Sequence, residues 1–223
     1  MVAITTTRPL RIAEYAPRGR RAGVAAATLV KSVLDRLGAL LIIVAILPIL
    51  LAVIVAVRLD GGLAFFTQVR VGRGGRTFRM VKFRSMVVDA EALKAKLAGR
   101  NEGSGPLFKM RNDPRITRIG AVLRKYSIDE LPQLFNVLTG SMSLIGPRPC
   151  LPTEAATFTS REHRRHLVKP GLTGLWQVSG RSNLSWAESV ALDLRYVDEW
   201  SLVMDLRIAV KTFGAVLASR GAY

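Results

Sequence analysis

A long apolar segment constrains the fold of this chain more than any other feature of its sequence. Residues 37–57 contain no charged side chain, and a straight helix of that length reaches roughly 30 Å, which matches the hydrocarbon core of a bilayer. Hydropathy therefore predicts a spanning helix. Pro48 lies in the middle of the segment, however, and an internal proline bends or breaks a helix.

The charges that flank this segment favour a different path. Basic residues lie on both sides of it: Arg18, Arg20, Arg21, Lys31 and Arg36 before it, and Arg58, Arg70, Arg73 and Arg76 after it. The positive-inside rule would place both ends on the cytoplasmic side of the membrane. A re-entrant helix that enters, bends near Pro48 and leaves by the same face satisfies this preference. On composition alone, both the spanning and the re-entrant path stay open.

Composition points to polyanionic partners. The chain has 223 residues, is 49% hydrophobic and carries a net charge of +17. This length and hydrophobicity suit one compact domain with a membrane element. The positive charge favours nucleic acid, anionic lipid or phosphorylated substrates as partners. One cysteine and two histidines exclude a disulfide framework and a histidine-rich metal site. We expect a flexible basic arm over residues 1–28, a re-entrant membrane helix over 29–58 and a cytoplasmic catalytic domain over 59–223. The arm is a poor secretory signal, because the apolar run starts late.

The rest of the pattern predicts an α+β fold that is mostly helical. Residues 65–71 and 77–83 read as strands joined by the glycine-rich turn Gly72-Arg73-Gly74-Gly75, which predicts a small β-hairpin. Helical segments are expected over residues 87–97, 116–126, 131–138, 184–197 and 202–217, with Gly140 as a helix stop. Loops are expected over residues 99–106, 146–149 and 170–174. Some of these helices are expected to be amphipathic and to lie at the membrane interface.

Two adjacent acids, Asp129 and Glu130, are the main candidates for chemistry. Ser127 stands three residues before Glu130, a spacing typical of a capping box, so a helix is expected to begin here. Acidic residues at a helix start often do no more than stabilise the helix. The surroundings favour more, because basic residues cluster around the pair: Arg111, Arg115, Arg118, Arg124 and Lys125 before it and Arg148 after it. A diphosphate substrate with Mg²⁺ requires such a cluster, with one carboxylate attacking phosphorus and the other holding the metal.

Other charged residues have a plain alternative reading. Lys82 and Arg84 lie at the end of a strand and could be the solvated charges of a strand edge. Arg148 lies between two prolines and could belong to a surface turn, and Asp205 could cap a helix or form a local ion pair. His163 and His166 make a poor metal site on their own.

Several motifs, in order along the chain, resemble the bacterial sugar transferases, the monotopic polyprenyl-phosphate phosphoglycosyl transferases. The matching segments are KSVLD (31–35), FTQVRVG (66–72), KFRSM (82–86), DPR (113–115), LRKYSIDELPQ (123–133), GPRP (146–149), KPGLTGLWQ (169–177) and WSL (200–202) with Asp205. Each motif is weak, but this many in order is specific. The chain is most similar to the small exopolysaccharide-priming members.

The resemblance implies a reaction and a location. Asp129 would attack the sugar-bearing phosphate of a UDP-sugar, UMP would leave, and undecaprenyl phosphate would accept the sugar phosphate, in the first membrane step of exopolysaccharide biosynthesis. Glu130 matches the Mg²⁺-associated acid. Further active-site positions match Lys82, Arg84, Arg124, Arg148 and Asp205. The enzyme would lie on the cytoplasmic face of the bacterial inner membrane, in contact with lipid. Its re-entrant membrane helix would bend near Pro48. The donor sugar is a guess between galactose and glucose, and a homodimer is left open.

Three rival functions remain to be weighed. A nucleic-acid-binding protein fits the charge, but no recognition motif is visible, and we expect no nucleic-acid partner. A membrane scaffold would need no acidic pair. A glycosyltransferase that moves sugar without phosphate would release UDP in place of UMP.

Overall fold

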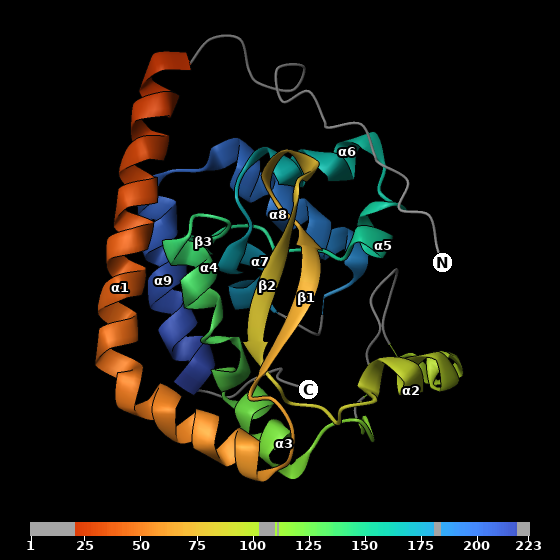
Figure 1. Ribbon diagram of the computed structural model, residues 1–223. Coiled ribbons are helices and arrows are strands. Elements are labelled where there is room, and N and C mark those ends of the chain that lie inside the picture. Colours follow the sequence, from red (N-terminus) through yellow and green to blue (C-terminus); the bar gives the residue numbers. More distant parts are fainter. Residues whose placement is uncertain (1–20, 103–109, 111, 181–183, 218–223) are drawn as a thin grey trace.

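The computed structural model describes residues 21–102, 110, 112–180 and 184–217 of the chain (Figure 1). Residues 1–20 of the expected basic arm, and residues 103–106 of the loop expected over 99–106, lie outside the described residues. The described part is mostly helical and carries a small β-hairpin, as the sequence predicts. The hairpin crosses a body of short helices, and one long helix runs along its side.

The long helix is α1 (Arg21–Leu59), and it contains Pro48. It starts earlier than expected, so residues 21–28, which the sequence assigned to the arm, are helical. Within the described residues, α1 is the one helix long and apolar enough to cross a membrane, since an 18-residue stretch of Ala26–Leu59 has a mean hydropathy of 3.5. One such helix is weak evidence for a span. Only 17% of its apolar window is buried, however, which is unlike the core helix of a soluble protein.

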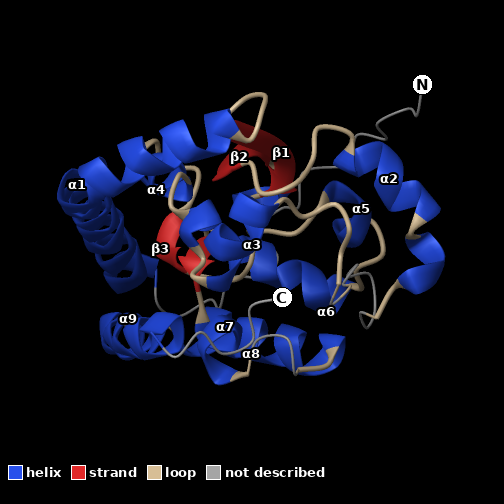
Figure 2. Ribbon diagram, turned by 90° about the horizontal axis from the view of Figure 1, so that it is seen from below, coloured by secondary structure: helices blue, strands red, loops and turns tan. Residues whose placement is uncertain are grey.

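One face of α1 packs on the body and the other is bare. Ala39, Ile43 and Leu50 are buried in the main core, whereas Leu41 and Val44 on the outer face are more than half exposed. Figure 1 shows α1 running down one side of the body and then changing direction to continue beneath it. Figure 2 shows α4 and β3 on the inner side of α1, and one end of α1 beside α9. The long helix therefore lies against the body over much of its length.

The hairpin consists of β1 (Phe65–Val71) and β2 (Thr77–Phe83), as expected. The strands are antiparallel, with Phe65 opposite Phe83 and Val71 opposite Thr77. The turn between them is the 3-10 element η2 (Arg73–Gly75), in which Gly74 and Gly75 have φ values of 70° and 77°. These left-handed conformations are open to glycine at little cost, which explains the glycine-rich turn.

After the hairpin the chain forms α2 (Ala90–Lys96), η3 (Ala98–Arg100), α3 (Arg118–Lys125), η4 (Ile128–Glu130) and α4 (Gln133–Leu138). Met80 and Phe83 of β2 are buried against Leu123 of α3 and Leu134 of α4. Gly140, with φ of 84°, follows the end of α4 as predicted. These contacts fix β2 on the short helices that carry the two adjacent acids.

The predicted capping box at Ser127 is wrong. Ser127 has φ of 57° and ψ of 23°, and its side chain makes no capping hydrogen bond. A left-handed residue at this position ends α3, because the Ser127 amide donates to the carbonyl of Arg124. The next turn is the 3-10 element η4, and Pro132 then leads into α4. The two acids therefore lie in a tight connection between two helices.

A second strand pair was not predicted. β3 (Ser143–Ile145) and β4 (Gly171–Thr173) are parallel, with Ser143 opposite Gly171. A Cβ atom on Gly171 would lie 2.1 Å from the amide nitrogen of Gly146, so only glycine fits this contact. The segments expected as loops around residues 146 and 171 are therefore packed backbone to backbone.

The C-terminal half completes the body with α5 (Pro152–Ala155), α6 (Ser160–His163), η5 (Arg164–Leu167), α7 (Leu175–Ser179), α8 (Trp186–Glu199) and α9 (Leu202–Leu217). A capping box of Ser185 and Glu188 starts α8. Tyr196 of α8 and Ile208 of α9 are buried with Ile145 of β3 in a separate core. Two of these helices therefore pack on the same strand that faces α1.

Candidate active site

Asp129 and Glu130 differ sharply in exposure. Asp129 is 7% exposed, whereas the side chain of Glu130 is 39% exposed. The tight η4 turn produces this difference, because successive residues of a short turn point in different directions. One acid is therefore embedded in the protein and its neighbour reaches the surface.

Lys82 of β2 holds Glu130 in place. Its Nζ donates to Oε1 of Glu130 over 2.6 Å. Phe83 and Met80 of the same strand are buried, which fixes the hairpin on the core. This register brings Lys82 to the dyad, the pair formed by Asp129 and Glu130. Burial alone would raise the pKa of the Glu130 carboxyl, but the charge and hydrogen bond of Lys82 outweigh it and lower the pKa. Glu130 is thus an anion at neutral pH.

Asp129 has the opposite tendency. Burial raises the pKa of its carboxyl to about 6, and the negative charge of Glu130 acts in the same direction. Lys82 and Arg124 oppose this rise, because a cation favours the ionised acid. The two acids thus titrate differently, and Asp129 is a relatively basic carboxylate that is still mostly ionised above neutral pH.

Two arginines act on Glu130 through their charge. Arg148 and Arg70 both lower the pKa of Glu130 through their positive charge. Nη1 of Arg148 lies 3.6 Å from Oε2 of Glu154, and its side chain is 31% exposed. Arg70 is 7% exposed. The structure therefore brings together five of the predicted residues, Asp129, Glu130, Lys82, Arg124 and Arg148.

Two other predicted residues lie at the end of α1 or within it. Arg84 donates from Nη2 to the carbonyl oxygen of Val57 over 2.8 Å and from Nε to that of Leu63 over 2.9 Å. It therefore caps the last turn of α1, where a cation is favoured. Pro48 lies inside α1, which is a different element from the η4 turn that carries Asp129 and Glu130.

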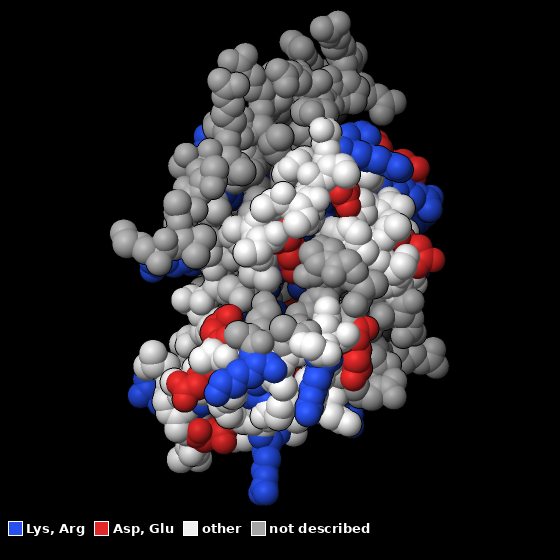
Figure 3. Space-filling model, turned by 90° about the vertical axis from the view of Figure 1, so that its right-hand side faces the viewer, with Lys and Arg blue, Asp and Glu red and all other residues white. Residues whose placement is uncertain are grey.

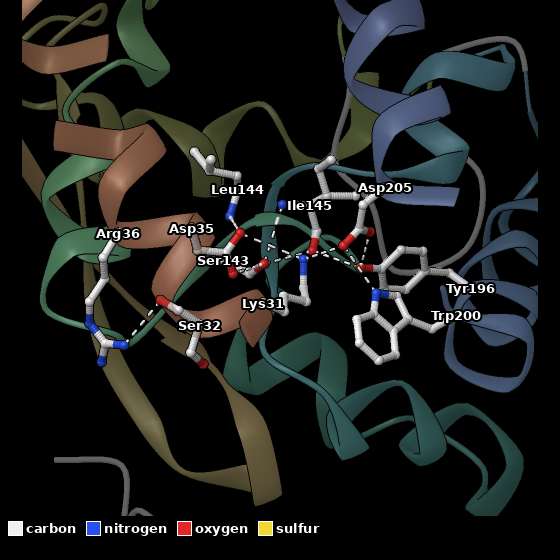
Figure 4. Close-up of polar contacts among 10 residues, drawn as sticks. All are labelled: Lys31, Ser32, Asp35, Arg36, Ser143, Leu144, Ile145, Tyr196, Trp200 and Asp205. Carbon is white, nitrogen blue, oxygen red and sulfur yellow. Dashed lines mark hydrogen bonds and ion pairs between the residues drawn. The ribbon is translucent and has the colours of Figure 1, made fainter. Parts of the chain in front are cut away.

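Asp205 belongs to a separate polar network (Figure 4). Its carboxylate accepts hydrogen bonds from Lys31 Nζ at 2.7 Å, from the Tyr196 hydroxyl at 2.8 Å and from Trp200 Nε1 at 3.0 Å. Asp35, 3.6 Å from Lys31, accepts hydrogen bonds from the Ser143 hydroxyl and the Leu144 amide. This network joins α1 to α8, α9 and β3. Among the described residues, the hydrogen bonds of the Asp205 carboxylate are thus with α1, Tyr196 and Trp200, and not with Asp129 or Glu130.

Sequence reasoning missed Arg70 as a residue of this site. Arg70 stands between Val69 and Val71, so strand alternation would assign it to the polar, solvent-facing side. In the structure it is buried, whereas Val69 is 47% exposed. No local pattern carries this information, since it depends on the segment around residue 149 that covers the end of β1.

The residues present fit a magnesium ion in one limited way. No group of three or more His, Cys, Asp or Glu residues suited to a metal occurs among the residues that the structure describes. Mg²⁺ is commonly held by one or two carboxylates together with substrate phosphates. Glu130 meets this need, because its side chain is partly exposed and only one of its two carboxylate oxygens, Oε1, bonds to Lys82. The protein could hold the ion only together with a phosphorylated substrate.

Charges of both signs are spread over the face shown in Figure 3, which carries α2 and α5. Blue and red groups are interspersed there, and atoms of both colours are visible in a hollow near the centre. The described residues on this face therefore form no continuous basic stripe of the kind that tracks a nucleic-acid backbone.

Comparison with known proteins identifies the family. Residues 26–219 match the family model of the bacterial sugar transferases. The galactosyl transferase CpsE of Streptococcus agalactiae is 50% identical over 195 residues, which cover 86% of this chain and 43% of the relative. The exopolysaccharide production protein ExoY of Sinorhizobium fredii is 42% identical over 194 residues, covering 85% of this chain and 86% of the relative.

A third relative carries a more detailed name. The undecaprenyl-phosphate galactose phosphotransferase of Salmonella typhimurium is 43% identical over 198 residues, covering 86% of this chain and 41% of the relative. The chain thus spans less than half the length of the Streptococcus and Salmonella relatives and most of the length of ExoY. The chain belongs to the bacterial sugar transferase family.

Proposed function

We propose that this protein transfers a sugar-1-phosphate from a UDP-sugar to undecaprenyl phosphate, with Asp129 as a covalent nucleophile. The observation that carries the proposal is the buried Asp129 beside the Glu130–Lys82 pair, ringed by cations. A buried carboxylate with a raised pKa is a stronger base than a solvated one, which suits attack on phosphorus. The names of the Salmonella and Streptococcus relatives support the lipid acceptor and a galactosyl donor.

In the first step an oxygen of Asp129 attacks the sugar-bearing phosphorus of the UDP-sugar. A bond forms between that oxygen and phosphorus, and the bond from phosphorus to the bridging oxygen breaks. The electron pair leaves with the bridging oxygen as UMP. Arg124 and Arg148 supply positive charge beside the phosphates, where charge develops in the transition state.

In the second step a phosphate oxygen of undecaprenyl phosphate attacks the same phosphorus. The bond from Asp129 to phosphorus breaks, which restores the carboxylate and yields a polyprenyl-diphospho-sugar. Since one phosphoanhydride bond is exchanged for another over the two steps, the protein contributes mainly positioning and charge neutralisation. A second cycle can then begin without any change in the protein.

Glu130 would hold Mg²⁺ together with the diphosphate. The ion, when bound, neutralises charge on the departing UMP phosphate. Lys82 keeps Glu130 ionised and fixes its direction through their hydrogen bond. Its role is therefore to keep the ligand carboxylate ready for the metal and to balance the charge of the dyad.

The same proposal places the protein on the cytoplasmic face of the bacterial inner membrane. α1 would enter the membrane, bend near Pro48 and return, so that both of its basic flanks stay inside. The exposed face of α9 supports an interfacial position for that helix too, since it carries a row of apolar residues, Leu202, Val203, Leu206, Val210 and Phe213. An apolar helix face at the interface would bury these side chains among lipid.

Nucleotide release tests the proposal. The full chain is purified in lipid nanodiscs with undecaprenyl phosphate, Mg²⁺ and either UDP-galactose or UDP-glucose, and the released nucleotide is separated and identified. Release of UMP that is lost in Asp129→Asn supports the proposed reaction and names the donor. Release of UDP would make the protein a glycosyltransferase, and UMP release that survives in Asp129→Asn would remove the nucleophile from Asp129.

Trapping the intermediate separates the covalent route from direct transfer. The enzyme is incubated with a UDP-sugar labelled in the sugar, without undecaprenyl phosphate, and the protein is denatured and analysed by mass. Retained sugar phosphate on the peptide that contains Asp129 supports the two-step route. A scaffold protein would show neither nucleotide release nor label, and Asp129→Asn would then leave its cellular role unchanged.

A further inference from the structure

Two consecutive backbone carbonyls next to Arg148 accept hydrogen bonds from buried arginines. Arg165 Nη2 donates to the carbonyl oxygen of Arg148 at 3.4 Å, and Arg70 Nη1 donates to that of Pro149 at 3.0 Å. The two arginines come from two different elements, η5 and β1. Arg148 therefore stands on a main chain that is held by two buried side chains.

Arg70 is fixed at its other end. Its Nη2 donates to Gln68 Oε1 at 2.6 Å, and the amide of the next residue, Val71, donates to the Cys150 carbonyl at 2.9 Å. Burial and the charge of Arg148 lower the pKa of Arg70 to about 10, so the group remains a cation at neutral pH. Its Nε has no hydrogen-bond partner among the residues that the structure describes. A buried cation of this kind is costly, so its retention calls for a reason beyond packing.

Arg165 is braced in turn by Asp193 of α8. The two side chains form an ion pair and are almost fully buried. The guanidinium of Arg165 lies 5.4 Å from the ring centre of Phe158 and 5.6 Å from that of Trp186, so it packs beside this pair of adjacent aromatic rings. A planar guanidinium fits this setting better than an ammonium group would.

The side chain of Arg148 also has a buried partner. Glu154 is 4% exposed, lies 3.6 Å from Arg148 and accepts a hydrogen bond from the Leu151 amide at 2.7 Å. Both the backbone and the guanidinium of Arg148 are therefore positioned by buried charged groups. This much organisation around one partly exposed arginine exceeds what a surface turn needs.

We propose that Arg70 is a positioning residue, which holds the carbonyl of Pro149 and so aims Arg148 at the phosphate groups of the substrate. This inference rests on the proposed function, because it takes Arg148 as a phosphate contact. It assigns Arg70 no direct contact with the substrate. Apart from the charge that Arg70 places near Glu130, the effect of losing Arg70 should therefore pass through Arg148.

A double-mutant cycle tests that dependence. Arg70→Met removes the hydrogen bond and the charge at similar length, and it should lower kcat/KM for the UDP-sugar by about 10- to 100-fold, the scale of a misplaced binding group. In an Arg148→Met background the same change should cost no more than about 3-fold, because coupled residues are not additive. Equal losses in both backgrounds would mean that Arg70 acts by itself or through general stability, and would overturn the inference.

Arg70→Lys separates position from charge. Lysine keeps the positive charge but cannot make the two directed bonds to Pro149 and Gln68 together. Activity should therefore remain low in Arg70→Lys, and full activity would overturn the inference in favour of a purely electrostatic role. Arg79→Met is the matched control, since Arg79 is an exposed arginine on the partner strand and should lose less than about 2-fold. Melting temperatures of all variants report any general loss of stability.

A second readout keeps this test separate from that of the proposed reaction. If the wild type releases no UMP from either donor, the proposed reaction fails, and the same four proteins are compared for binding of UMP by calorimetry. Losses of affinity that are not additive would still support the positioning role of Arg70. Additive losses, or no binding of UMP by the wild type, would overturn it.

Discussion

Nζ of Lys82 lies 2.6 Å from Oε1 of Glu130, which joins the hairpin to the turn between α3 and α4 across 48 positions of sequence. The contact sets the ionisation of both acids, because Lys82 lowers the pKa of Glu130 and opposes the rise in the pKa of Asp129. One lysine on a strand thus controls a pair of carboxylates on a different element.

The first prediction concerns the acid limb of the pH–rate profile. Since the pKa of Asp129 is raised to about 6, the ionised nucleophile is lost as pH falls through that value. We expect kcat/KM for the UDP-sugar to fall tenfold per pH unit well below pH 6 and to level off above about pH 7. Initial rates of UMP release between pH 5 and 8.5 measure this. A flat profile down to pH 5 would contradict the raised pKa.

Removing Lys82 should move the acid limb of the pH–rate profile to higher pH. In Lys82→Met, Asp129 loses a cation that stabilises its ionised form, so its pKa rises and the limb moves to higher pH. Glu130→Gln should move the limb the other way, because a like charge is removed. Rates of UMP release at low donor concentration, which follow kcat/KM, report both shifts. Lys96→Met, at an exposed position of α2, serves as the control and should leave the limb in place.

Asp205→Asn should weaken the fold more than it changes substrate binding. The carboxylate of Asp205 accepts hydrogen bonds from Lys31, Tyr196 and Trp200, and the first of these partners would be left as a cation with a more distant counter-charge. We expect a loss of about 1–3 kcal/mol in unfolding free energy, the usual cost of a buried charged group left short of a partner. KM for the UDP-sugar should stay within a factor of about 2. A large rise in KM with unchanged stability would instead return Asp205 to the substrate site.

Pro48→Ala should change the topology of α1. Without proline the helix regains a backbone hydrogen bond and straightens, which favours a spanning path. Single cysteines at Leu29 and Asp60, in a Cys150→Ser background, are labelled with a membrane-impermeant maleimide in intact cells and in inverted vesicles. The wild type should react at both sites only in inverted vesicles, and Pro48→Ala should expose one of them to the outside. An unchanged labelling pattern in Pro48→Ala, matching the control Ile49→Ala, would show that the proline does not determine the path.

The local sequence pattern was sufficient to predict those elements whose structure is decided by neighbouring residues. The two strands of the hairpin start and end where alternation and the glycine-rich turn predict, and Gly140 follows α4 as expected. The same holds for the long apolar helix, although it begins earlier than its apolar run. The acidic pair was found from its basic surroundings, but the reason given for its helix start was wrong. A left-handed residue 127 cannot be read from a Ser-x-x-Glu spacing that usually marks a cap.

What escaped prediction depends on contacts between distant segments. The β3–β4 pair has three residues in each strand, which is too short for a period to appear. Arg70 is buried by the segment around residue 149, and Asp205 is engaged by a helix near the other end of the chain. Each of these facts requires the three-dimensional arrangement, since a charged residue in a strand or helix is exposed more often than not.

The pairing of Lys31 with Asp205 also bears on how the protein is made. These partners are 174 positions apart, so at roughly 5–20 residues per second the ribosome needs roughly 10–35 s to reach the acid after it has added the lysine. During that interval α1 has emerged and its nearest counter-charge is Asp35, one turn away. The helix can therefore meet the lipid surface first, and the body can close over its polar end only after residue 205 has been made.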